Sequence, residues 1–115
     1  MAKKITAKKK LKSLIRYDEF GRGLGLPSMK ADFCDKAYEN QKFVIAYLKM
    51  ECHTVTAVAG EKAFDVFRGE EIATEKMLIT DGEYSWNNTL SYYVENYNLR
   101  LPKDFEEKAI AYMKK

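Results

Sequence analysis

The residues best suited to metal binding or nucleophilic catalysis are Glu51, Cys52 and His53, which are consecutive in the chain. A metal site needs three or four converging ligands, and neighbouring residues of a strand point to opposite faces. A cysteine–histidine nucleophile needs the same convergence, with His53 in hydrogen-bonding reach of Cys52 or Cys34 and a third group to orient it. We therefore predict no metal site, and we interpret Cys34 and Cys52 as reduced structural thiols.

Carboxylate pairs are the other candidates for chemistry. They are Asp18–Glu19, Glu70–Glu71 and Glu106–Glu107. Neighbours in sequence do not face one another on a helix, and acid–base catalysis would need at least one of them to be buried. The glycines of Tyr17–Pro27 fit neither a dinucleotide fingerprint nor a P-loop. The sequence predicts a protein that is not an enzyme and binds no cofactor.

Tyrosine is abundant near the C-terminus. Tyr93 and Tyr97 lie on the apolar stripe of a predicted helix with Leu90 and Val94, and Trp86 lies in the strand before it. We expect Trp86, Tyr93 and Tyr97 in the core, with the phenol oxygens at its edge.

Two other tyrosines, Tyr84 and Tyr92, fit equally well in the core or in an exposed aromatic patch for a protein partner. Asn96 lies one helical turn after Tyr92, on the side away from the apolar stripe. The candidate protein-binding residues are Tyr84, Tyr92, Asn96 and Arg100. The predicted function is that of a non-catalytic protein-binding module, such as an inhibitor or immunity-type factor. The same surface would also suit a homodimer.

Basic residues are concentrated at the N-terminus, where residues 1–30 carry a net charge of +7 against −4 for the remainder. The alternative function is nucleic-acid binding, because lysines and arginines contact phosphates. The candidate residues are Lys3, Lys4, Lys8, Lys9, Lys10, Lys12 and Arg16. A solubilising tail is the competing interpretation, since no aromatic residue precedes Tyr17.

Composition places the chain among ordinary globular proteins. It has 115 residues, of which 46% are hydrophobic and 32% charged, enough for one modest core. No apolar run reaches the length that spans a bilayer, and no signal-type apolar region follows the basic start. We predict a cytoplasmic protein with no membrane contact.

The clearest local signals lie between Met77 and Pro102. Asp81-Gly82, flanked by β-prone residues, predicts a hairpin with a type I′ turn, which has positive φ at both centres. The apolar stripe predicts a helix over Thr89–Tyr97, and Pro102 suits the first position of a last helix.

Upstream, the elements are less sharply defined. We expect a short helix from Thr6 onward, and one interrupted or two consecutive helices across Met29–Glu51. Within that range Lys42–Leu48 could instead be a buried strand. The β-branched segment His53–Gly60 predicts a strand, and short strands at Ala63–Phe67 and Glu71–Ala73 would lead into the hairpin.

Together these elements predict an α+β fold: N-terminal helices, a small antiparallel meander of three to five short strands, and two C-terminal helices over one sheet face. We place a basic arm and glycine-rich linker at residues 1–27 and a single domain at residues 28–115.

The segment from Ile79 to Phe105 contains TDGEYSWNNTLSYYVENYNLRLPKDF. Its aspartate-glycine turn, Trp, Tyr-rich helix and Leu-Pro start resemble small uncharacterised bacterial proteins, several of them from mobile elements. The resemblance covers about the last third of the chain and implies no activity.

Overall fold

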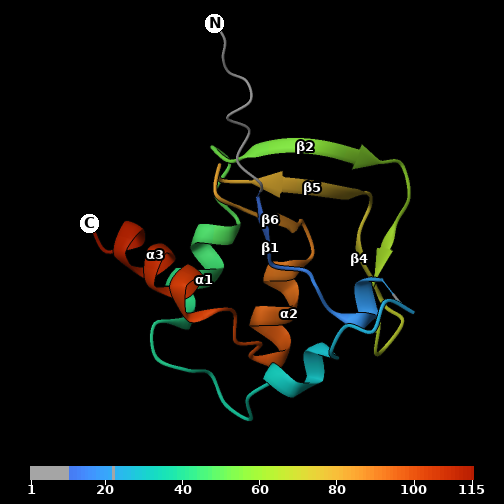
Figure 1. Ribbon diagram of the computed structural model, residues 1–115, viewed down its shortest axis with the longest axis horizontal. Coiled ribbons are helices and arrows are strands. Elements are labelled where there is room, and N and C mark those ends of the chain that lie inside the picture. The colour runs from blue at the N-terminus through green and yellow to red at the C-terminus, as the bar shows by residue number, and fades with distance from the viewer. Residues whose placement is uncertain (1–10, 22) are drawn as a thin grey trace, which may run out of the picture.

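The computed structural model describes residues 11–21 and 23–115 and has an α+β fold (Figure 1). Its strands are β1 (Lys12–Ser13), β2 (Thr54–Ala59), β3 (Ala63–Phe64), β4 (Glu71–Ala73), β5 (Lys76–Thr80) and β6 (Tyr84–Asn87). Its α-helices are α1 (Gln41–Leu48), α2 (Leu90–Tyr97) and α3 (Lys103–Met113), with short 3-10 helices at Asp18–Phe20 and Met29–Asp32. None of the helices in these described residues is long and apolar enough to cross a bilayer.

The main sheet has the order β1-β6-β5-β2, and β3 and β4 form a separate two-stranded sheet. The β5–β6 hairpin closes at the predicted Asp81-Gly82 turn, but the type I′ geometry is wrong, because Gly82 has a φ of +100° and Asp81 has no positive φ. The Asp81 carboxylate instead accepts hydrogen bonds from the backbone N–H groups of Glu83 and Tyr84. Asp81 N also donates to the Tyr84 carbonyl at 3.3 Å, so Gly82 and Glu83 are the central residues of the turn and Asp81 needs no positive φ.

The first described residues correct three predictions. Lys12 and Ser13 form a strand that pairs in parallel with Tyr84 and Ser85, so residues 11–13 are not helical and the sheet is mixed instead of wholly antiparallel. Leu14 and Tyr17 are buried in the same core as the helices. Part of the predicted arm and linker therefore belongs to the folded domain, because Leu14 and Tyr17 contribute to its core. Residues 6–10 of the predicted helix lie outside the described residues.

The region predicted as one or two helices contains a 3-10 helix and α1. Ser28 caps the first, its Oγ accepting from Lys30 N at 3.1 Å. Asn40 has a left-handed φ of +66° and immediately precedes α1. The strand alternative for Lys42–Leu48 is wrong, since these residues lie in α1.

The C-terminal helices follow their predictions closely, and Pro102 directly precedes α3. In Figure 1 the three α-helices lie together on one side of the main sheet. The core between them contains Trp86, Tyr93 and Phe105, each at most 1% exposed. The core positions predicted for Trp86 and Tyr93 are confirmed, and Tyr97 is half-buried at its margin.

Candidate protein-binding surface

Strand β2, with the sequence TVTAVA, is exposed along its whole length. Its β-branched residues favour extended backbone, and Gly60 follows its end. On one side β2 pairs with β5, and no other strand of the described residues pairs with its outer edge. In Figure 1 it lies at the top of the view, next to β5. The sheet therefore ends in an unpaired row of backbone donors and acceptors.

Pairing defines which side chains of β2 face the helices. Val55 lies opposite Ile79, which lies opposite the buried Trp86, so all three share one face. A register irregularity between Val55 and Ala57 returns Val58 to that same face, opposite Met77. Although they are on the helix side, Val55 and Val58 are 47% and 56% exposed. The helices thus leave the apolar face of the edge strand uncovered.

A hollow of about 330 Å³ adjoins this uncovered face. Its apolar lining comes from Val55, Ile79 and Trp86 of the sheet and from Leu48 and Met50 at the end of α1. Among buried side-chain nitrogens and oxygens of the described residues, only Trp86 Nε1 has no hydrogen-bond partner. Lys49 and Glu51 place one charge of each sign on the lining. A strand edge beside an apolar hollow is the arrangement by which sheet edges recognise extended peptides.

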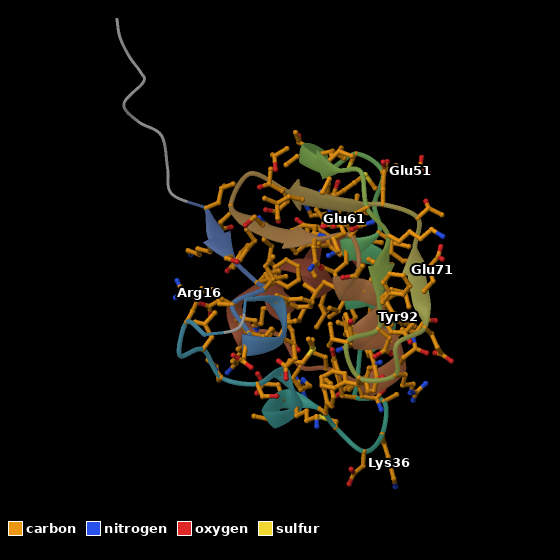
Figure 2. All side chains as sticks on the ribbon, turned by 90° about the vertical axis from the view of Figure 1, so that its right-hand side faces the viewer. Arg16, Lys36, Glu51, Glu61, Glu71 and Tyr92 are labelled. Carbon is orange, nitrogen blue, oxygen red and sulfur yellow. The ribbon has the colours of Figure 1, made fainter. Side chains whose placement is uncertain are left out.

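The residues predicted to bind a partner do not form one surface. Tyr84 is buried, its ring packing edge-on against Phe105 with centroids 5.0 Å apart, so the exposed position considered for it is not found. Tyr92 is half-buried, and Asn96 is exposed one turn farther along α2. Figure 2 shows Tyr92 beside the β3–β4 segment. Asn96 Nδ2 donates to the Tyr92 carbonyl at 2.9 Å, so this pair is held within its own helix.

Arg100, the fourth predicted residue, is tied to the start of α3. Its Nε and Nη2 donate to the two carboxylate oxygens of Glu106 at 3.1 and 2.7 Å. Its guanidinium lies 4.1 Å from the ring centroid of Tyr38. Glu106 is buried and also accepts from Leu101 N. The contacts of Arg100 are therefore structural, and the predicted partner contact stays a prediction.

The alternative nucleic-acid surface is described only at Lys12 and Arg16. Lys12 Nζ lies 3.3 Å from Glu83 Oε2, and Arg16 is exposed and projects from the margin of the molecule (Figure 2). Lys3, Lys4, Lys8, Lys9 and Lys10 lie outside the described residues. Nucleic-acid binding stays a prediction.

Asp65, which sequence reasoning did not single out, is the centre of a buried hydrogen-bond cluster. Its Oδ1 accepts from the N–H groups of Phe67 and Arg68 at 2.7 and 2.9 Å. Its Oδ2 accepts from the hydroxyls of Tyr92 and Tyr97 at 2.7 and 2.6 Å. Burial alone would raise the pKa of Asp65, but these four donors lower it to about 2. Asp65 thus fastens the β3–β4 turn to α2.

Asp81 forms a second cluster of the same kind. Besides its two turn N–H groups, it accepts from the Tyr47 hydroxyl at 2.6 Å and pairs with Lys108 at 2.9 Å, both at Oδ2. Burial opposes ionisation, yet these donors lower the pKa of Asp81 to about 2. Burial, together with the hydrogen bond to this carboxylate, raises the pKa of Tyr47.

The Glu51–His53 segment borders this second cluster. His53 Nε2 donates to the Tyr47 carbonyl at 2.8 Å, and Cys52 is exposed. Both cysteines are free. Within residues 11–21 and 23–115 no three His, Cys, Asp or Glu side chains are grouped so as to hold a metal ion.

Comparisons with family models, curated proteins and solved structures give no match.

Proposed function

We propose that this chain is a non-catalytic protein-binding module that adds an extended segment of a partner protein to the outer edge of β2. In such strand addition, backbone hydrogen bonds hold the segment, and pockets for alternate side chains select its sequence. The observation that carries the proposal is that all six residues of β2 are exposed, and β5 alone among the described strands pairs with them.

The composition of β2 supports the proposal because it lacks most of the usual protection of a free edge. Sheet edges are commonly guarded by lysines, prolines or inward-pointing charges. The TVTAVA sequence has none of these, and the irregularity near Thr56 is its one departure from a regular edge. An unprotected apolar edge is a cost to solubility unless something binds it.

The hollow beside Val55 indicates what the partner segment contains. An extended segment on the β2 edge would present every second side chain to the Val55 face. An aliphatic or aromatic side chain at one such position would enter the hollow lined by Leu48, Ile79 and Trp86. An inhibitor or immunity-type factor is one form of this activity, in which the bound segment belongs to the inhibited protein.

A displayed library of random peptides, selected on the immobilised full chain at low surface density, tests the proposal directly. We expect enriched peptides with alternating apolar residues. In amide NMR spectra they should shift the resonances of residues 54–59 first. Val58→Lys, which places a charge on the apolar side of the edge, should weaken a selected peptide by about 10-fold or more.

Val66→Lys is the matched control, because Val66 is another exposed valine, 38% exposed, and lies outside β2. Both variants should melt within a few degrees of the wild type, since both change exposed side chains. The proposal fails if no peptide is enriched, if the shifts fall elsewhere, or if Val66→Lys weakens binding as much as Val58→Lys.

A further inference from the structure

We propose that the segment bound to β2 in the free protein is β2 of a second copy, so that two main sheets join into one across a two-fold axis. This inference rests on the proposed function of the β2 edge and names its first partner. Two antiparallel strands related by a two-fold axis present the same residues to each other, and such isologous contacts are the commonest basis of homodimers.

The faces of β2 select one register. Residues opposite each other in an antiparallel pair lie on the same face of the sheet. Val55 and Val58 share the helix-side face, whereas Ala57 and Ala59 lie opposite Leu78 and Lys76 on the other face. Val55 can therefore face Val58 of the second copy, and Thr54 then faces Ala59. A shift of one residue would place Val55 opposite Ala57 or Ala59, whose side chains lie on the other face of the sheet.

This register also overlaps all six residues of both strands and brings apolar side chains together. Val58 of one copy comes beside Val55 of the other, next to the hollow that Ile79 and Trp86 line. The irregularity near Thr56 falls on the two-fold axis. The bend of one strand thus meets the same bend in its copy, which a regular strand would not match.

No charge on the strand opposes this register. All six residues of β2 are neutral, so nothing along the strand repels its own copy.

Sedimentation velocity over a concentration series from low micromolar to near millimolar tests the dimer. We expect a monomer–dimer equilibrium that Val58→Lys shifts by about 100-fold in dissociation constant, because each of two equivalent contacts loses an anchor. Val66→Lys should leave it unchanged.

Disulfide trapping tests the register of the two β2 strands. In a Cys34→Ser, Cys52→Ser background, Thr54→Cys with Ala59→Cys places cysteines opposite each other across the axis, and mild oxidation should give a covalent dimer. Thr54→Cys with Ala57→Cys is the matched control, since its cysteines on the same face meet only in a slipped register. More cross-linking in the control than in the first pair overturns the register.

The outcomes separate this inference from the proposed function. A monomer at every concentration, with peptides still bound at residues 54–59, overturns the homodimer and leaves strand addition standing. A dimer insensitive to Val58→Lys also overturns the homodimer through β2. Absence of both the dimer and peptide binding overturns both proposals.

Discussion

Asp65 and Asp81 lie in different hairpin turns and use their carboxylates in nearly the same way. Each Oδ1 accepts from the backbone N–H groups two and three residues ahead, and each Oδ2 accepts from a tyrosine hydroxyl of a helix. They differ in the fourth donor, which is the hydroxyl of Tyr97 for Asp65 and the ammonium of Lys108 for Asp81. A buried carboxylate can thus be kept ionised either by neutral donors alone or with the help of a cation.

The difference predicts unequal costs when the carboxylates are removed. Asp65→Ala leaves two tyrosine hydroxyls and two turn N–H groups without their acceptor in a buried site, and we expect a loss of about 3–4 kcal/mol in the free energy of unfolding. In Asp81→Ala the ammonium of Lys108 keeps Glu83 as a partner at 3.0 Å. We expect a loss of about 2 kcal/mol. Urea unfolding of both variants measures the two losses, and a larger loss for Asp81→Ala would contradict this account.

Acid should affect both turns alike, because the pKa of each carboxyl is lowered from 3.8 to about 2. A lowered folded-state pKa gives stability that is complete above about pH 4 and is lost as the pH falls through about 2. Each carboxylate should contribute about 2 kcal/mol at neutral pH, since one pKa unit corresponds to about 1.4 kcal/mol. Urea midpoints between pH 5 and pH 2 measure the effect.

Asp65→Asn and Asp81→Asn are the controls for that experiment. Each should be less stable at neutral pH, and each should flatten the acid dependence by a similar amount. If only one of them flattens it, the two carboxyls do not share the same pKa, and the comparison fails.

Local signals in the sequence were sufficient for several elements. The stripe at Leu90, Tyr93 and Val94 predicts α2, because a period of 3.6 residues is visible within a few turns. Asp81-Gly82 likewise marks the hairpin. The strand β1 could not be found in this way, since its partner Tyr84 lies far along the chain and a parallel pair leaves no local pattern.

The clusters and the binding surface depend on contacts that no short stretch of sequence records. Asp65 precedes Gly69 in a turn that its side chain caps, and this local signal could have been read. The hydroxyls of Tyr92 and Tyr97 come from 27 and 32 residues away, so their role could not be predicted from the sequence. Similarly, β-branched residues predict the strand β2, but only the order of the sheet makes it an edge.

The smallest expected effect is a difference between the Asp65 and Asp81 clusters in how their stability depends on salt concentration. Lys108→Met keeps an unbranched apolar chain near the Tyr84 ring but removes the charge beside Asp81. We expect a loss of about 1 kcal/mol in the free energy of unfolding at low ionic strength and about half of that in ~1 M salt, because the Lys108 side chain is 33% exposed and open to screening.

Tyr97→Phe removes a neutral donor to Asp65 and should cost about 1–2 kcal/mol at both salt concentrations. Measuring each variant against the wild type in the same buffer cancels the general effect of salt on folding. If the Lys108→Met loss is independent of salt, the ammonium of Lys108 acts on Asp81 as one more hydrogen-bond donor, and the distinction between the two turns disappears.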